Sequence, residues 1–215
     1  MPEVYKLLLD TRRPGDTEYD AVILPNGESN KWRYYFLNPH LYPESLLPAE
    51  VSFLANFQYL HDRDCLFTDS GLFVVRKRLV DLFTSIDGLK YLKVPCLMID
   101  DTYFGERYDE CNELHAEVPV NKAFYALRFS SVGNYFDPVN SVFRPMRSNP
   151  NMPGRIKRLF LKAPKEGFPP IFRTQEQISS LFVTRVVKDL IEKNKIKGCY
   201  FEEVEVTEET STNES

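Results

Sequence analysis

A chain of 215 residues, of which 43% are hydrophobic, 27% charged and 13% aromatic, can bury a full core and lies outside the compositions of disordered proteins. Its net charge of -4 argues against nucleic-acid binding, which usually requires a basic face, and suits a basic partner better. No apolar run approaches the roughly 20 residues that span a bilayer, and the first residues lack the pattern of a signal peptide. We therefore expect a cytoplasmic protein without a membrane segment, whose four scattered cysteines are reduced thiols.

The first fifty residues are dense in Pro, Gly, Asn and Tyr, a composition that predicts short strands and loops. Their apolar runs, over 4–9, 21–24 and 32–37, are the expected strands. Trp32, the only tryptophan, begins the third run and is expected in the core, since large aromatic side chains are mostly buried. A short helix is predicted next, over 48–57.

A clearer helix is predicted to begin at Asp69 or Ser70, either of which can act as an N-cap. Its apolar positions recur with the period of a helix, and they are Val75, Leu79, Leu82, Phe83 and Ile86. Gly88 is expected to end this helix, and the apolar residues that follow predict a strand over 89–99. Further strands are predicted over 123–129 and, with one basic edge, over 155–161.

The C-terminal segment predicts a helix between two strands. Thr184 is expected to cap the helix, which buries Val187, Leu190 and Ile191, and Gly198 is expected to stop it. Residues 200–206 alternate without a clean apolar face, which predicts a partly exposed or edge strand. The residues from 207 to 215 are mostly Glu, Thr, Ser and Asn, and they predict a disordered acidic tail.

One stretch of sequence recurs within the chain. Leu-Phe-Val-Val-Arg at 72–76, with Asp-Leu at 81–82, returns as Leu-Phe-Val-Thr-Arg at 181–185, with Asp-Leu at 189–190. Chance or a duplicated helix–strand unit explains this likeness, because any amphipathic helix start uses such residues. Together the elements predict an α+β fold with a mixed or antiparallel sheet and a few packed helices. We expect one domain over 1–206, with an irregular part over 1–50.

A mirrored pair of short motifs is the sharpest candidate for a chemical site. His61 and Cys65 stand four residues apart, as do Cys111 and His115, so each pair could form half of a tetrahedral zinc site if it lay on a helix. The same residues could serve a thiol enzyme, although the acidic neighbours of Cys111 oppose a thiolate. No phosphate-binding glycine loop, G-x-S-x-G or H-E-x-x-H motif occurs. We therefore expect no enzyme, no cofactor and no metal, and keep the zinc or thiol enzyme as the alternative.

Residues 100–117 carry seven carboxylates against the single base Arg107. Such a run is either a solvated loop or a surface that attracts a basic partner. Nearby aromatic residues, among them Phe104, favour the second interpretation, because exposed aromatics among acids suit an interface. The basic stretch at 155–165 favours phosphate binding instead, although neighbouring acidic residues commonly balance the charge of such a strand. The expected partner-binding residues are Asp100, Asp101, Tyr103, Tyr108, Asp109, Glu110 and Glu113.

Several segments, taken in order, resemble one protein family. They are residues 70–79, 125–129, Phe136-Asp137-Pro138 with Ser141, 155–161, 171–173 and 181–206. The family consists of immunity proteins of bacterial polymorphic toxin systems and was first catalogued as a domain of unknown function; the resemblance extends over residues 66–206. It implies an α+β scaffold in the cytosol of the producing cell, which blocks a cognate toxin encoded nearby by tight binding and has no active site. The first fifty residues match no part of it.

Overall fold

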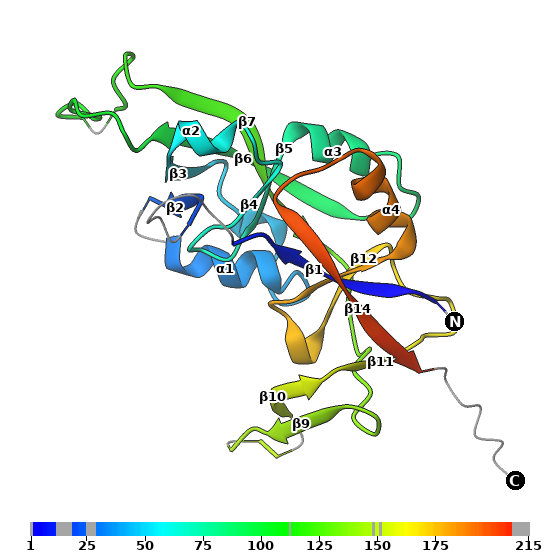
Figure 1. Cartoon of the computed structure of the whole chain (residues 1–215). Coiled ribbons are helices and arrows are strands. Elements are labelled where there is room, and N and C mark those ends of the chain that lie inside the picture. The colour runs from blue at the N-terminus through cyan, green and yellow to red at the C-terminus, as the bar shows by residue number, and fades with distance from the viewer. Residues whose placement is uncertain are drawn as a thin grey trace, which may run out of the picture.

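The strands in the described part of this chain form two six-stranded sheets and a separate hairpin (Figure 1). The computed structural model describes residues 2–11, 19–24, 29–111, 113–147, 149–150 and 152–207. We call one sheet the terminal sheet, because it contains the first and last strands of the described chain, and the other the middle sheet. The described residues thus form an α+β fold with mixed sheets, as the sequence predicts.

The terminal sheet places the two ends of the described chain side by side. Its strands are, in spatial order, β11 (Phe160–Lys162), β14 (Cys199–Thr207), β1 (Val4–Leu9), β13 (Leu181–Thr184), β12 (Ile171–Thr174) and β8 (Val132–Gly133). The pairs β11–β14 and β12–β8 are parallel and the others antiparallel. Because β1 pairs with both β13 and β14, the N-terminal strand closes the C-terminal half of the fold.

The middle sheet is built from residues 21–129. Its strands are, in spatial order, β2 (Ala21–Ile23), β3 (Val51–Ala55), β6 (Tyr91–Asp100), β7 (Val120–Phe129), β5 (Phe73–Arg76) and β4 (Cys65–Leu66). Only β3 and β6 are parallel. The separate hairpin consists of β9 (Val142–Pro145) and β10 (Pro153–Arg158).

Helices pack on the sheets, and two of them share an apolar cluster with both sheets. The helices are α1 (Ser29–Leu37), α2 (Phe57–Leu60), α3 (Lys77–Phe83) and α4 (Arg185–Lys193), with 3-10 turns at Glu44–Leu46 and Gln175–Gln177. Val187 and Ile191 of α4 pack in one apolar cluster with Phe83 of α3, with Phe73 of the middle sheet and with Leu181 of the terminal sheet. In the described part of the chain, no helix is long and apolar enough to cross a membrane.

The recurring sequence occupies equivalent places in the two sheets. In the middle sheet β5 leads into α3 and then β6, and β7 lies between the two strands, antiparallel to both. In the terminal sheet β13 leads into α4 and then β14, and β1 lies between them, again antiparallel to both. The two units therefore share one local topology. A duplication stays a prediction, because unrelated segments also reach this arrangement.

Three of the predicted elements are wrong, because tertiary packing outweighed the local sequence pattern. Residues 32–37 lie in α1 rather than in a strand, since Trp32 and Phe36 are one helical turn apart and both enter the core. Residues 51–55 form β3 rather than a helix, with alternate side chains buried. The helix expected from Asp69 begins only at Lys77, because Val75 and its neighbours are buried in β5 between β4 and β7.

The end of the C-terminal helix also differs from the prediction. Thr184 occupies the N-cap position of α4 but makes no capping hydrogen bond through its side chain. The helix ends at Asn194 and Lys195, and the latter adopts a positive φ of 52°. Gly198 lies beyond this stop, in the contact between the sheets. The strand that follows, β14, is partly exposed, as the sequence predicts, and β11 pairs with it only at Glu205, Val206 and Thr207. It includes Thr207; residues 208–215 of the expected tail lie outside the described residues.

Candidate functional site

The long connection between β6 and β7 contains every predicted partner-binding residue except Asp100, which ends β6. The two strands pair from Tyr91 with Phe129 to Ile99 with Val120, so their open end carries the connection away from the rest of the sheet. Figure 1 shows this end of the pair projecting beyond α2 and β3. We call residues 101–119 the acidic connection. Its position gives a partner access to it from several sides.

Hydrogen bonds within the acidic connection fix its backbone. The Oδ1 atom of Asp109 accepts from the amides of Cys111 and Glu113, each at 2.8 Å. Arg107 donates from Nη2 to the carbonyl oxygens of Asp101, at 3.1 Å, and Tyr103, at 2.9 Å. An ordered loop loses less conformational entropy on binding than a mobile one. These bonds therefore reduce the conformational entropy that the described residues of the acidic connection would lose on binding.

Two of the predicted binding carboxylates hold the backbone, each through its Oδ1 atom. Asp109 is one, and Asp100 is the other: its Oδ1 atom accepts from the amide of Thr102, at 3.0 Å, and from its hydroxyl, at 2.8 Å. Burial, and then the neighbouring charge of Asp100, raise the pKa of Asp101. The carboxylates with no such internal role belong to exposed glutamates, and they are those of Glu106, Glu110, Glu113 and Glu117.

Phe104 is the most exposed large apolar side chain of the acidic connection. Its relative exposure is 101%, whereas that of Tyr108 is 40%, and Tyr103 is half-buried with its ring against Gly105. Isolated exposed apolar residues are common, but an aromatic ring at the projecting end of an ordered acidic loop has the composition of an interface anchor. The sequence indicated Phe104 only through its acidic neighbours, because exposure cannot be deduced from one residue.

The alternative site of His61, Cys65, Cys111 and His115 is not assembled. Among the described residues, which include all four, no group of three or more His, Cys, Asp or Glu side chains could hold a metal ion. Cys65 is fully buried in β4, whereas Cys111 is exposed in the acidic connection. A hydrogen bond with Cys199, together with burial, raises the pKa of the Cys65 thiol well above its ordinary value. That thiol is therefore protonated and is a poor nucleophile at neutral pH.

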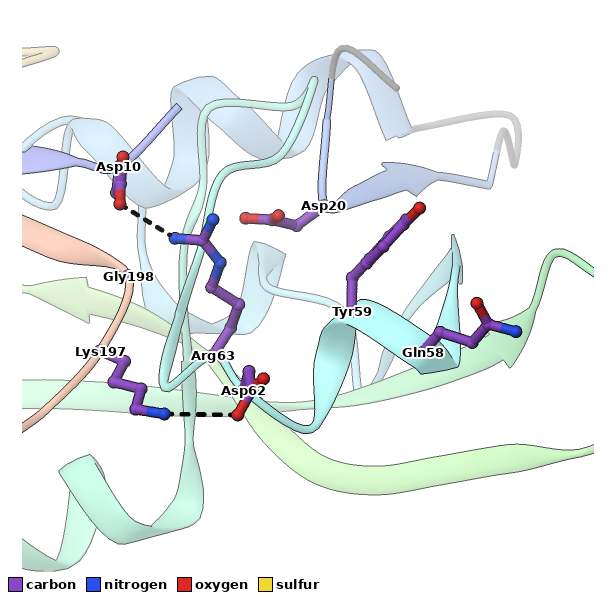
Figure 2. A pocket seen from close by; sticks show the side chains of 8 residues that line it. All are labelled: Asp10, Asp20, Gln58, Tyr59, Asp62, Arg63, Lys197 and Gly198. Carbon is purple, nitrogen blue, oxygen red and sulfur yellow. Dashed lines mark hydrogen bonds and ion pairs between the residues drawn. The ribbon is translucent and has the colours of Figure 1, made fainter. Parts of the chain in front are cut away.

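A polar cavity of about 460 Å³ lies where the two sheets meet (Figure 2). Arg63, which follows α2, points toward Asp10, which follows β1, with 3.3 Å between Nη1 and Oδ2. Lys197 reaches Asp62, with 3.3 Å between Nζ and Oδ1. Each described cation of the lining thus has a carboxylate beside it. These ion pairs link the residues after α2 to those after β1 and before β14. The charges of the cavity therefore have a structural role.

One cation of the basic stretch, Arg158, is balanced in the same way. The guanidinium of Arg158 binds the carboxylate of Glu205 on β14, with 2.6 Å between Nε and Oε2. This pairing agrees with the expectation that neighbouring acids offset the basic strand at 155–161. The carboxylates of the acidic connection, by contrast, have one guanidinium near them among the described residues, that of Arg107. Neither a protein-family model nor a curated protein matches this chain.

Proposed function

We propose that this protein is an immunity protein, which binds a cognate toxin in the cytosol of the producing bacterium and neutralises it. The acidic connection is the proposed contact, and the toxin offers it a basic surface. The proposal rests first on the resemblance of residues 66–206 to an immunity family. The observation that carries it furthest is an exposed aromatic side chain, Phe104, in a strongly acidic loop that has internal hydrogen bonds.

Electrostatics support a fast and specific encounter through this surface. Residues 100–117 contain seven carboxylates and one arginine, a net charge of -6 within one short segment of a chain whose net charge is -4. A concentrated field of one sign attracts a partner of opposite sign and suppresses wrong partners. The exposed carboxylates of Glu106, Glu110 and Glu113 supply this field, while Asp100 and Asp109 maintain the shape of the loop.

Tight binding also requires an apolar anchor and a small entropic penalty. Phe104 supplies the anchor, because burial of a fully exposed aromatic ring in a partner's pocket is among the largest single contributions to an interface. The internal hydrogen bonds of Asp109 and Arg107 supply the order. A partner with a basic rim around an apolar pocket fits both features.

The test is a growth assay with the toxin encoded by the gene beside that of this chain. Expression of the toxin alone should stop growth, and co-expression of the wild-type chain should restore it. The triple variant Glu106→Lys, Glu110→Lys and Glu113→Lys should lose this protection, because six units of charge change at the contact. We expect the affinity for the toxin to fall by roughly 100-fold or more.

The matched control reverses three exposed acids outside the acidic connection, Glu50, Asp87 and Glu166. It changes the net charge by the same amount, so any effect of overall charge is common to both variants. Full protection by this control, together with loss of protection in the first variant, supports the proposed contact. Equal protection by both variants would show that the acidic connection is only solvated.

A further inference from the structure

A second cavity, of about 400 Å³, has a lining unlike that of the polar cavity in Figure 2. It lies between the two sheets, where β1 and the start of β13 face α1 and the turn before β5. Apolar side chains of the shared core, among them Leu7, Phe73 and Leu181, form one part of its wall. Its volume falls within the range of small-molecule sites, which are typically mostly apolar with a few polar groups.

The charged part of this wall is entirely cationic. The described residues that line it include Lys6, Arg33 and Arg173 but no carboxylate, whereas the polar cavity carries three aspartates beside its two cations. Lys6 stands opposite Glu202 in the register of β1 and β14, so part of its charge is offset. Arg33 and Arg173 have no acidic partner among the described residues. An excess of positive charge in a chain of net charge -4 requires an explanation.

Arg173 is the more unusual of the two arginines. It is 4% exposed, and the hydrogen bonds of its side chain run from Nη1 to the carbonyl oxygens of Ile178, at 2.9 Å, and Ser180, at 3.2 Å. Its Nε atom is buried without a hydrogen-bond partner in the described structure. Burial lowers the pKa of Arg173 to about 10, which leaves the guanidinium charged at neutral pH. Buried charges are normally paired, since an unpaired one destabilises the fold by several kcal/mol.

Arg33 supplies a second guanidinium at the same cavity, from the exposed side of α1. A side chain at Gly71 would begin 3.4 Å from its Nε atom, so the guanidinium lies close to the backbone of the turn before β5. Gly71 has a φ of +68°, a conformation that glycine adopts without strain. The serines at 179 and 180 add hydroxyl groups to the wall. The donors therefore come from three separate segments and meet at one place.

We propose that this cavity binds a small organic anion, a carboxylate or phosphate on an apolar body, with the anionic group at Arg173 and Arg33 and the body against Leu7 and Leu181. Guanidinium groups bind both kinds of anion through paired, charge-assisted hydrogen bonds. Such a ligand would offset the unpaired charge of Arg173 and fill the apolar end of the cavity. The site is separate from the acidic connection, so it stands whether or not the protein binds a toxin.

The test compares phenylacetate and phenyl phosphate with phenylacetamide, the neutral analogue, by titration of the full chain in low-salt buffer. Backbone NMR signals of Leu7, Phe73 and Leu181, and the methyl signals of the two leucines, report occupation of the cavity. We expect one or both anions to bind with a Kd on the order of 1 mM or lower, and the amide at least about 10-fold more weakly. The tighter of the two anions identifies the preferred class of ligand.

Arg33→Gln is the informative variant, because its side chain is exposed and its loss should leave the fold intact. It should weaken anion binding by about 5-fold to 10-fold, whereas Lys90→Gln, which removes the same charge from an exposed site outside every described cavity, should not. Arg173→Met should abolish binding if the variant folds. No binding of either anion up to about 10 mM, equal binding of the amide, or equal anion affinity of Arg33→Gln and wild type would each overturn the proposal.

Discussion

Gly198→Ala should destabilise this protein by about 3–5 kcal/mol. A Cβ atom at this position would lie 2.2 Å from the carbonyl oxygen of Cys65, far inside contact distance. Gly198 also has a φ of +96°, which is strained for any residue with a side chain. Both effects act in the folded state. The free energy of unfolding, measured by urea titration, is the appropriate quantity.

The close approach has a structural cause. The amides of Asp64 and Cys65 both donate to the carbonyl oxygen of Lys197, each at 3.0 Å, and the amide of Asp10 donates to that of Gly198 at 2.9 Å. These bonds join β4 of the middle sheet to the start of β14 and the end of β1 in the terminal sheet. A side chain at Gly198 would push the two sheets apart at the point where they are hydrogen-bonded.

Gly88→Ala is the matched control for this prediction. Gly88 has a φ of +71°, but no atom lies within 4 Å of the position its Cβ would take. Its replacement should therefore show backbone strain alone, about 1 kcal/mol. If the two variants lose the same stability, the contact between Gly198 and Cys65 is not a constraint on the fold.

Asp137→Ala should destabilise the protein by about 2–4 kcal/mol, because it removes a buried carboxylate that several donors share. Asp137 is 6% exposed and accepts from the amides of Val139, at 2.9 Å, and Asn140, at 3.1 Å. It also accepts from the side chains of Asn140, at 2.8 Å, and Thr207, at 2.5 Å. The carboxylate thus ties the turn after β8 to the last residue of β14. Asp87→Ala, at an exposed acid, is the control and should change the stability by less than about 0.5 kcal/mol.

The same carboxylate should make stability depend on pH in a defined direction. Burial alone would raise the pKa of Asp137, but the hydrogen bonds from Thr207, Asn140 and the backbone outweigh it, so the pKa is lowered. A lowered pKa in the folded state stabilises the protein above the ordinary carboxyl pKa of about 4 and ceases to do so as the pH falls through the folded value. The stability gap between wild type and Asp137→Ala should therefore shrink below about pH 4. A gap that stays constant down to acid unfolding would contradict this role.

The parts of the fold that sequence could predict are those with a strong local pattern. The strands around Val94 and Leu127 and the helix that buries Val187 and Ile191 were predicted correctly, because each is apolar enough to be assigned from its own residues. Val75 was assigned to a helix because a helical period and a buried strand look alike over a few residues. Only the pairing of β5 with both β4 and β7 decides between them.

The two candidate sites also differ in how far the sequence alone could reveal them. The acidic connection is one continuous segment, so its composition alone identified it, although the structural roles of Asp100 and Asp109 required coordinates. The second cavity, the proposed anion site, is lined by Lys6, Arg33 and Arg173. These residues come from segments far apart in sequence, and no pattern along the chain links them. The sequence contains one relevant signal: Arg173, a charged residue, follows the apolar residues Ile171 and Phe172 in a strand. This pattern indicates a buried arginine but not what the arginine faces.

The most direct test of the proposed function is the dissociation constant of the complex between the purified chain and the toxin encoded by the adjacent gene, measured by calorimetry. For the wild-type chain we expect one-to-one binding with a Kd in the nanomolar range or below, and weaker binding as salt increases. For Glu106→Lys, Glu110→Lys and Glu113→Lys we expect a Kd raised by roughly 100-fold or more, with little change for the control at Glu50, Asp87 and Glu166. Absence of binding by the wild-type chain, or the same Kd for both variants, would contradict the proposal.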